Sequence, residues 1–347
     1  MKIAIATVQV PFITGGAEIL VNMLKQELIK RGHRAEVVTI PFKWYPSDSL
    51  EKSMMRGRMI DLSEINGEKI DRVIAMKFPA FYLKHDHKVI WLMHQHRQAY
   101  DLWETPYGDL HNFDNGEKLR KLIHECDKKY LEESDHIYTI AQNTSNRLLK
   151  YCGIQSDVLY HPPLNYEKLH CEEYGDYIFY ASRIDQIKRQ RLLVEAMQYV
   201  KTDVKAVIAG GGSEEEIAYL KELIKKHSLS NKVKLAGFIS EEEKIKYYAN
   251  CLGVYFGAYD EDYGYITLES FFAKKPIIVH EDSGGPLEFV TDEINGFVID
   301  DDPRMIAEKM DQWYLDKKLA QKQGENGYQS LLDKNINWDY VIDALLQ

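Results

Sequence analysis

The sequence lacks the long apolar run that a membrane-spanning helix requires. No stretch of about 18 apolar residues occurs, although 45% of the 347 residues are hydrophobic. The first residues, Met1 to Val8, carry one charge and no small-residue cleavage site. We therefore expect them to form a first strand and not a signal peptide. With 28% charged residues the composition is that of a folded chain, long enough for two domains.

Cysteine is scarce, and its four positions are scattered. Cys126, Cys152, Cys171 and Cys251 show no Cys-x-x-Cys spacing. This pattern argues against a metal site and for a reducing, cytoplasmic setting.

An excess of positive charge is also lacking, since the net charge is −10. Residues 1–165 carry 22 Lys and Arg against 21 Asp and Glu, whereas residues 166–347 carry 22 against 33. The acidic second half argues against a nucleic-acid partner. The near-neutral first half is the one expected to approach an anionic membrane surface, and the stretch Met54 to Met59, where apolar residues alternate with cations, is the candidate contact. A surface excursion with no membrane role is the alternative.

Strand and helix patterns alternate along the chain, and this alternation is given twice. Strands are expected in the first half at 3–8, 35–40, 72–76, 89–93, 137–141 and 158–160, and in the second at 177–181, 204–209, 233–235, 252–256, 277–279 and 296–299. His161-Pro162-Pro163 between the two sets favours an extended interdomain linker. The pattern predicts two α/β domains, each a mostly parallel, doubly wound sheet wrapped by helices. It leaves residues 43–69 unassigned.

The stretch from Glu261 to Glu269 carries the most specific signal. It joins the strand at 252–256 to a helical pattern that Pro276 ends, with Gly264 at the bend. Ligands of open α/β sheets bind at such loops, and a helix N-terminus favours an anion. Glu-x7-Glu with Tyr263-Gly264 inside resembles the signature of retaining glycosyltransferases of the GT4 family, which have the GT-B fold.

A second loop offers two cations five residues apart. Arg183 and Lys188 follow the strand at 177–181, and an arginine fork with a lysine point charge is a common pairing for phosphate. A solvated surface loop is the structural alternative. The stretch is similar to the Gly/Ser-Arg-Leu-x-x-x-Lys segment of the GT4 family, and this resemblance implies that both cations hold the donor diphosphate.

Glycines mark two further loops at strand ends. Thr14-Gly15-Gly16-Ala17-Glu18 joins the first strand to the first helix, but no G-x-G-x-x-G dinucleotide fingerprint occurs. It looks like the Gly-Gly-x-Glu loop of the family. Gly210-Gly211-Gly212 permits a close approach to a ligand, and the family has a glycine-rich turn there too.

A histidine ends the strand at 89–93 in the first half. By resemblance, His94 corresponds to the family histidine that contacts the donor sugar and is implicated in catalysis, with His96 as the alternative. The stretch Tyr100 to Trp103 offers an aromatic surface for a sugar, or core packing. Together with His96, Arg97 and Tyr100 are the candidates on the acceptor side.

The resemblance implies a GT-B fold of two Rossmann-like domains facing a central cleft. Residues 1–165 would bind the acceptor, 166–332 the nucleotide-sugar donor, and 333–347 would form a helix crossing back to the first domain. The implied activity is a retaining hexosyltransferase that uses a nucleoside-diphosphate-sugar and a glycan or lipid-linked saccharide acceptor, in cell-envelope polysaccharide synthesis at the inner face of the cytoplasmic membrane.

The resemblance also assigns roles to residues. The catalytic set is Glu261, His94, Arg183 and Lys188, and the donor-binding set is Gly15, Gly16, Arg183, Lys188, Gly211, Gly264, Tyr265, Ile266 and Glu269. Glu261 would hold hydroxyls of the transferred sugar, and Glu269 the nucleotide ribose. We expect no cofactor and no metal, because the two cations neutralise the diphosphate and the Asp-x-Asp at Asp260 overlaps the glutamate motif.

Two other classes of function remain open at this point. A GT-B epimerase or phosphorylase would use the same donor half with different residues in the first domain. A non-catalytic sugar-nucleotide-binding subunit would be favoured by degenerate residues at His94 and at Gly15-Gly16, and these positions are intact.

Overall fold

The computed structural model describes residues 1–13 and 15–347, and its contacts divide the chain into two units. Unit 1 comprises Met1–Leu164 with Asn337–Gln347, and unit 2 comprises Asn165–Ile336. The expected boundary after residue 165 lies one residue from this division. The expected tail at 333–347 starts too early, because helix α10 (Lys317–Asp333) still belongs to unit 2.

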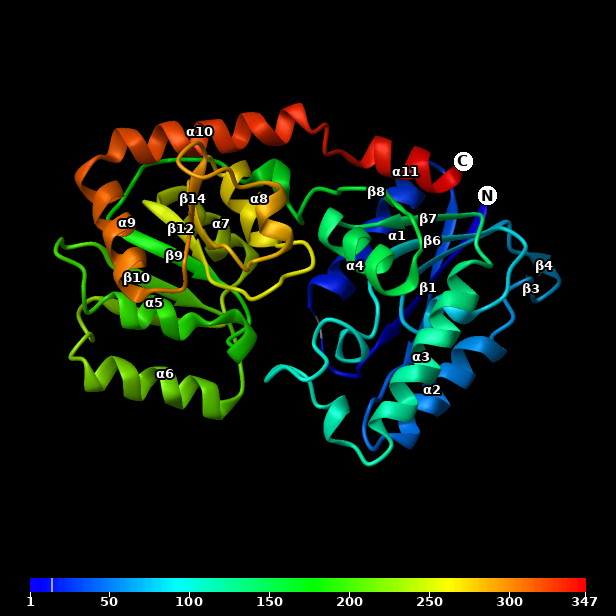
Figure 1. Ribbon diagram of the computed structural model, residues 1–347. Coiled ribbons are helices and arrows are strands. Elements are labelled where there is room, and N and C mark those ends of the chain that lie inside the picture. Colours follow the sequence, from blue (N-terminus) through cyan, green and yellow to red (C-terminus); the bar gives the residue numbers. More distant parts are fainter. Residues whose placement is uncertain (14) are drawn as a thin grey trace. The chain divides into compact units, whose positions relative to one another are not determined.

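Unit 1 is built on a six-stranded parallel sheet with strand order β2-β1-β5-β6-β7-β8 (Figure 1). The strands are β1 (Lys2–Gln9), β2 (Arg34–Pro41), β5 (Arg72–Lys77), β6 (Lys88–His94), β7 (His136–Thr139) and β8 (Asp157–Val158). The main connecting helices are α1 (Gly16–Lys30), α3 (Gly116–Leu131) and α4 (Gln142–Cys152), and the 3-10 turns are η1 (Ala80–Tyr82), η2 (Arg97–Ala99) and η3 (Leu110–Asn112). The next 3-10 turn in the chain, η4 (Tyr166–Lys168), belongs to unit 2. The strand order reverses between β1 and β5, which places a topological switch point there.

The unassigned stretch of the sequence forms a helix and a small hairpin. Helix α2 (Asp48–Met59) buries Leu50 and Met54. Its Gly57 packs against the backbone of Pro79, because an added Cβ would stand 2.4 Å from the Pro79 carbonyl oxygen. The hairpin pairs β3 (Glu64–Ile65) with β4 (Glu68–Lys69) in antiparallel register.

The last helix, α11 (Trp338–Leu346), packs on unit 1. The Trp338 ring lies 6.3 Å from that of Trp91, which is fully buried in β6. The Arg72 guanidinium donates to the Leu345 carbonyl at 2.9 Å, and the Tyr138 hydroxyl donates to that of Ala344 at 3.2 Å. These contacts explain why the final eleven residues belong with the first 164.

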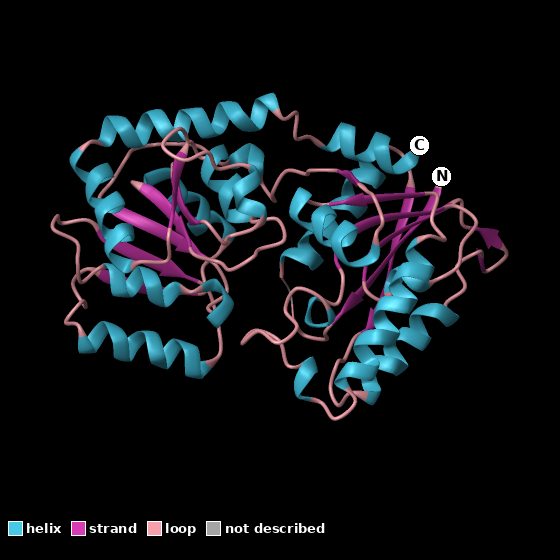
Figure 2. Ribbon diagram, in the orientation of Figure 1, coloured by secondary structure: helices cyan, strands magenta, loops and turns pink. Residues whose placement is uncertain are grey.

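Unit 2 is a second six-stranded parallel sheet, with order β11-β10-β9-β12-β13-β14 and helices on both faces (Figure 2). Its strands are β9 (Tyr177–Ala181), β10 (Lys205–Ala209), β11 (Val233–Gly237), β12 (Gly253–Phe256), β13 (Ile277–His280) and β14 (Gly296–Ile299). Its helices are α5 (Gln190–Ala196), α6 (Glu214–Lys226), α7 (Glu241–Asn250), α8 (Tyr265–Phe272), α9 (Pro303–Leu315) and α10, with 3-10 turns η5 (Gln186–Lys188) and η6 (Gly285–Glu288). The order reverses between β9 and β12, so the loops after these strands meet at the switch point.

The predicted fold class is confirmed, since both halves are doubly wound parallel α/β domains of the GT-B type. All twelve predicted strands occur, and no strand end differs from its predicted position by more than two residues. No helix in the described part of the chain is both long and apolar enough to cross a bilayer.

Candidate functional site

The loops after β9 and β12 bring Lys188 and Glu261 together. Lys188 ends the 3-10 turn η5 after β9, and Glu261 lies in the loop between β12 and α8. The Lys188 Nζ donates to Glu261 Oε2 in an ion pair whose side chains are 16% and 25% exposed. The loops after β9 and β12 therefore bring these two side chains into contact at the switch point.

Backbone hydrogen bonds fix the position of Glu261. Its N–H donates to the Ser283 carbonyl at 2.8 Å, and its own carbonyl accepts from Gly285 N at 2.8 Å. The loop after β12 is thus tied to the loop after β13, where Gly284 pairs with Glu261 as an isolated bridge. This pairing holds the carboxylate on a rigid strand-like segment.

Arg183, in the same loop as Lys188, is largely exposed. Its side chain is 64% exposed and forms an ion pair with Asp185 at 3.0 Å. An exposed pair of this kind contributes little stability, so it can exchange partners at low cost when an anion arrives. The geometry leaves Arg183 available to a phosphate ligand.

The three glycines after β10 differ in how closely other residues pack against them. A Cβ at Gly210 would stand 1.8 Å from the Ser182 carbonyl oxygen, and one at Gly212 would stand 2.4 Å from that of Ile184. These two glycines allow the loops after β9 and β10 to touch. A Cβ at Gly211 would meet nothing within 4 Å, so packing against described residues does not require glycine there. Gly211 therefore borders open space, and its donor-binding role stays a prediction.

The first turn of α8 adds a positive helix end to the site. Gly264 is the N-cap with φ 81 and ψ 60, in the left-handed region, and a Cβ there would stand 2.7 Å from the Pro286 ring. Tyr265 and Ile266 follow as the first helical residues, where N–H groups have no acceptor within the helix. The N-terminal end of α8 favours a negative group.

Glu269 lies one turn further along α8 and is 6% exposed. Its two carboxylate oxygens accept from the Lys244 ammonium and the Tyr248 hydroxyl of α7, both at 2.8 Å. Burial by itself would lower the pKa of Lys244, but the Glu269 carboxylate raises it. The sequence did not indicate Lys244 or Tyr248, because they precede Glu269 by 25 and 21 residues.

In unit 1 the loop after β1 leads into the N-terminus of helix α1. Gly15 precedes α1, and its N–H donates to the Glu18 carboxylate at 2.8 Å, while Gly16 is the first helical residue. Glu18 also lies 3.8 Å from the Lys77 ammonium at the end of β5. Thr14, which begins this loop in the sequence, lies outside the described residues.

The structure separates the two candidate histidines. His94 ends β6 and is half-buried, and its Nδ1 donates to the Gln95 carbonyl at 2.7 Å, which fixes the tautomer. The His96 ring packs against Phe42 and Phe78 with centroids at 6.2 and 5.3 Å, and burial lowers the pKa of His96 to about 3. His96 is therefore a neutral packing residue, whereas His94 stays partly exposed at the end of β6.

The aromatic surface expected at Tyr100 is not present. Tyr100 is 3% exposed, its ring stacks on that of His124 at 4.3 Å, and its hydroxyl donates to Asp127 at 2.8 Å. The packing alternative is the correct one, and Tyr100 does not reach an acceptor. Arg97 is held by two hydrogen bonds to Asp101, at 2.8 and 2.6 Å.

A buried carboxylate that the sequence did not indicate organises this loop. Asp127 of α3 is fully buried and accepts from Tyr82, Tyr100 and Gln95 at 2.6, 2.8 and 3.1 Å. Burial raises the pKa of Asp127 to about 6, against the lowering effect of these donors. Since Gln95 is the neighbour of His94, Asp127 fixes the loop that carries the candidate histidine.

The Asp-x-Asp formed by Asp260 and Asp262 lies in the loop between β12 and α8. In the part of the chain that the structure describes, no three His, Cys, Asp or Glu residues are placed to hold a metal ion. Asp260 instead uses its N–H to bind the Asp282 carbonyl at 2.8 Å, as part of the link between the loops after β12 and β13.

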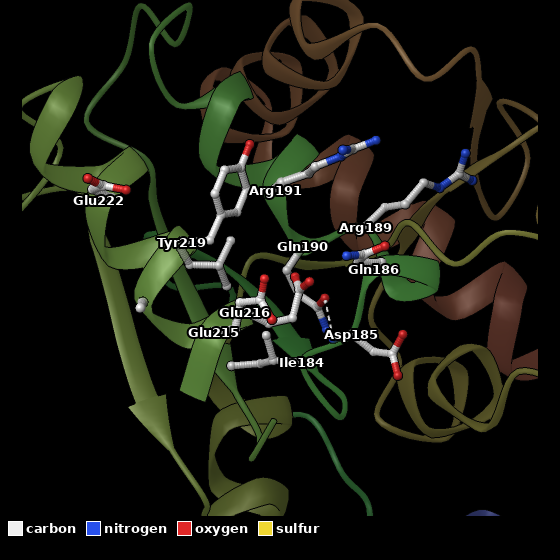
Figure 3. Close-up of a pocket in the computed structure, with 12 residues that line it drawn as sticks. Ile184, Asp185, Gln186, Arg189, Gln190, Arg191, Glu215, Glu216, Tyr219 and Glu222 are labelled. Carbon is white, nitrogen blue, oxygen red and sulfur yellow. Dashed lines mark hydrogen bonds between the residues drawn. The ribbon is translucent and has the colours of Figure 1, made fainter. Parts of the chain in front are cut away.

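A cavity of about 560 Å³ opens beside the η5 turn, between α5 and α6. Asp185 and Gln186 line one side, and Glu215, Glu216 and Tyr219 of α6 line the other (Figure 3). The cavity carries charges of both signs, so its lining does not select one ligand.

The sequence of unit 2 matches a known family. Residues 163–330 match the model of glycosyl transferases group 1. Over these residues, which make up most of unit 2, the chain is similar to glycosyl transferases group 1. This confirms the resemblance that the Glu-x7-Glu and Arg-x4-Lys patterns indicated.

Two curated relatives match part of the chain. An alpha-1,3/1,6-mannosyltransferase ALG2 of Dictyostelium discoideum is 32% identical over 140 residues, which are 39% of this chain and 33% of that protein. An N-acetylgalactosamine-N,N'-diacetylbacillosaminyl-diphospho-undecaprenol 4-alpha-N-acetylgalactosaminyltransferase of Campylobacter jejuni is 30% identical over 36% of this chain and 33% of that protein. The match thus spans about a third of the length of these relatives.

Solved structures match the fold over nearly the whole chain. Sucrose-phosphate synthase from Thermosynechococcus elongatus has a TM-score of 0.79 at 16% identity and covers 99% of this chain and 98% of its own. HepE of Anabaena, in complex with UDP and glucose, has a TM-score of 0.68 at 15% identity and covers 97% and 96%. At these identities the likeness shows the fold alone.

Proposed function

We propose that this protein is a glycosyltransferase that moves a sugar from a nucleoside-diphosphate-sugar to a saccharide or lipid-linked saccharide acceptor. The observation that carries the proposal is the ion pair of Lys188 with Glu261 at the switch point of the unit that matches the family, with Arg183 exposed in the same loop as Lys188. A fold neighbour in complex with UDP and glucose supports a nucleotide-sugar as the donor.

In this proposal the charged side chains of unit 2 act in two steps, first on the diphosphate and then on the sugar. Departure of the nucleoside diphosphate builds negative charge on the leaving oxygen, and Arg183, Lys188 and the N-terminal end of α8 stabilise that charge. Lys188 is paired with Glu261 in the structure, so a bound diphosphate competes with Glu261 for the ammonium. Glu261, once released, holds hydroxyls of the transferred sugar, and Glu269 holds the ribose.

The proposed mechanism is that of a GT4 enzyme, with retention at the anomeric carbon and no metal. The two cations neutralise the diphosphate in place of a metal ion. The leaving phosphate assists deprotonation of the acceptor on the same face of the sugar, and His94 contacts the donor sugar from unit 1. The loop at Gly15 and Gly16 contributes backbone N–H groups.

On the acceptor side we propose work at the inner face of the cytoplasmic membrane, in cell-envelope polysaccharide synthesis. The Campylobacter relative is named for a diphospho-undecaprenol acceptor, which supports a lipid-linked class. Helix α2 supports a membrane contact, although with fewer residues than the sequence suggested: Met54 is buried, and Arg58 is held by Glu133. Its outer face exposes Lys52, Arg56, Met55 (62%) and Met59 (79%).

These four residues are spaced so that they share one face of the helix. An apolar pair flanked by cations suits a shallow contact with anionic headgroups.

The donor proposal is tested by ligand binding followed by product analysis. Thermal-shift measurements with UDP-, GDP- and dTDP-sugars should show stabilisation by one nucleotide class. NMR of the product should then show a new glycosidic bond with the anomeric configuration of the donor. Epimerised nucleotide-sugar, or sugar 1-phosphate formed from a glycan, would place the protein in another class of GT-B enzyme.

The membrane contact is tested by co-sedimentation with vesicles that contain phosphatidylglycerol. The double change Met55→Ser and Met59→Ser should reduce binding severalfold at constant salt. Ile29→Ser is the matched control, because Ile29 is an apolar residue on α1 that is 49% exposed and far from α2 in the sequence. Equal binding by wild type and both variants would contradict this contact.

A further inference from the structure

We infer that Arg189 is a positioning residue, which holds Lys188 and Glu261 at the fixed separation that transfer requires. The inference rests on the proposed function of these two residues, and it assigns a role to a side chain that the motif does not include. Arg189 follows Lys188 directly in the chain, yet the two side chains bind different partners.

Arg189 is buried in spite of its charge. Its side chain is 4% exposed. The guanidinium forks onto Asp282, with Nη1 to Oδ2 at 2.9 Å and Nη2 to Oδ1 at 2.5 Å, and its Nε donates to the Gly257 carbonyl at 2.6 Å. Asp301 stands 3.8 Å away, and the Tyr259 ring lies 5.7 Å from the guanidinium carbon. A bidentate fork of this kind specifies geometry as well as binding strength.

These contacts join three loops at the carboxyl ends of three strands. Arg189 comes from the loop after β9, Gly257 from the loop after β12, and Asp282 from the loop after β13. Backbone bonds run alongside: Tyr259 N donates to the Ile187 carbonyl at 2.9 Å, and Asp260 N to that of Asp282 at 2.8 Å. The Arg189 side chain thus connects all three loops. Lys188 and Glu261 belong to two of these loops, those after β9 and β12.

The backbone at Arg189 also indicates a specific requirement. Its φ of 52 and ψ of 37 lie in the left-handed region, which an arginine adopts only when surrounding contacts enforce it. Arg189 in this conformation is the N-cap of α5. The side chains of Lys188 and Arg189 bind different partners on either side of it. Arg189 is one of the residues that line the neighbouring cavity, and in Figure 3 its guanidinium points away from Glu215 and Glu216.

The physical consequence concerns turnover more than binding. Lys188 has a long flexible stem, so it can still reach the phosphates of a free nucleoside diphosphate when its backbone loosens. Transfer requires Lys188 on the phosphate and Glu261 on the sugar of the same donor at the same time. A small misplacement between two such groups reduces the rate strongly.

The test compares Arg189→Gly, Arg189→Lys and the control Arg191→Ala. Glycine accepts the left-handed conformation, so the first variant removes the fork without adding backbone strain. Arg191 is exposed, and it lies two residues away on α5. The readouts are the dissociation constant for UDP or GDP alone, and kcat for UDP release from UDP-glucose or GDP release from GDP-mannose, whichever pair the wild type uses.

We expect Arg189→Gly to lower kcat at least tenfold while the dissociation constant for the free nucleotide changes less than threefold. Arg189→Lys should restore part of kcat, since one ammonium can still reach Asp282. Arg191→Ala should match the wild type. If Arg189→Gly does not fold, Asp282→Asn carries the same test, because it keeps the size of the partner and weakens the fork.

Three results would overturn the inference. Unchanged kcat with only a lower melting temperature would make Arg189 a stability residue. A loss of nucleotide affinity as large as the loss of kcat would make it a direct ligand of the donor. A lysine variant no better than the glycine variant would remove the role of the Asp282 contact. Failure of the wild type to bind any nucleotide would instead refute the proposed function, and so the two failures are distinguishable.

Discussion

Replacing Glu269 by glutamine tests whether the second glutamate of the motif is held as the structure describes. The change keeps the size of the side chain and removes its charge. The Glu269 carboxylate now accepts from both Lys244 and Tyr248 at 2.8 Å and is 6% exposed. Glutamine replaces one of the two acceptor oxygens by an NH2 donor, so it can accept from Lys244 but only donate to the Tyr248 hydroxyl, and neither contact involves a charged carboxylate.

The size of the effect follows from burial and from the second partner of Lys244. A hydrogen bond to a charged group contributes about 1.5–3 kcal/mol. The Lys244 side chain is 18% exposed and also lies 3.1 Å from Glu241, so it keeps part of its compensation. We therefore expect a loss of about 2 kcal/mol in the free energy of unfolding. For a domain of this size that corresponds to a melting temperature lower by about 4–8 °C.

Glu261→Gln is the matched comparison. Glu261 and its partner Lys188 are 25% and 16% exposed, and such a partly solvated pair contributes about 0–1 kcal/mol. Its melting temperature should therefore change less than that of the Glu269 variant. Turnover should fall more than nucleotide affinity in the Glu261 variant, whereas the Glu269 variant should bind the bare nucleoside diphosphate more weakly.

Thermal melting, calorimetric affinity for the nucleoside diphosphate and initial rates measure these three quantities. Equal losses of nucleotide affinity in the two variants would refute the division of the donor between the two glutamates. An unchanged melting temperature for Glu269→Gln would refute the energetic importance of its contacts with α7.

Three further predictions concern charge. Arg183→Ala and Lys188→Ala should each weaken binding of the nucleoside diphosphate by about 1.5–3 kcal/mol, and unchanged affinity in both would exclude them as phosphate ligands. Activity should survive thorough chelation, whereas a strict need for Mg²⁺ or Mn²⁺ would restore Asp260 and Asp262 as candidate ligands. The pKa of Asp127 is raised from 3.8 to about 6, so its stabilising contribution is complete below about pH 4 and is lost as the pH rises through about 6. Denaturant unfolding from pH 4 to 8 should therefore show the wild type losing up to about 3 kcal/mol relative to Asp127→Asn, and a difference independent of pH would contradict this titration.

The strands were predictable because they are short and apolar, and β1, β5, β6, β9, β12 and β13 are buried along most of their length. Tyr177–Ala181 and Gly296–Ile299 have the bounds that the apolar runs gave. Helix α2 was not assigned, because its buried face of Leu50, Ser53, Met54 and Gly57 includes a serine and a glycine. Gly57 is selected by the close Pro79 backbone, a contact that the local pattern does not contain.

The site was predictable where one loop carries its own signal. Arg183, Lys188 and Glu261 lie in segments with short, specific spacing, and the structure brings Lys188 and Glu261 into contact. The choice between His94 and His96 depends on Phe42 and Phe78, which are distant in the sequence and close in the fold.

Arg189 gave no signal for a similar reason. A second cation beside Lys188 looks like solvated surface until Asp282, 93 residues later, is placed against it.

The return of α11 to unit 1 has a consequence for the order in which the protein can be completed during synthesis. Strand β6 is made early, but the Trp338 ring that packs near its Trp91 is made only after all of unit 2 has been translated. The carbonyl acceptors for Arg72 and Tyr138 arrive with the same helix. On the ribosome, unit 2 can therefore finish folding while unit 1 still waits for its last element, although unit 1 begins first. A chain released just before residue 337 would carry an intact second unit and an open apolar patch on the first.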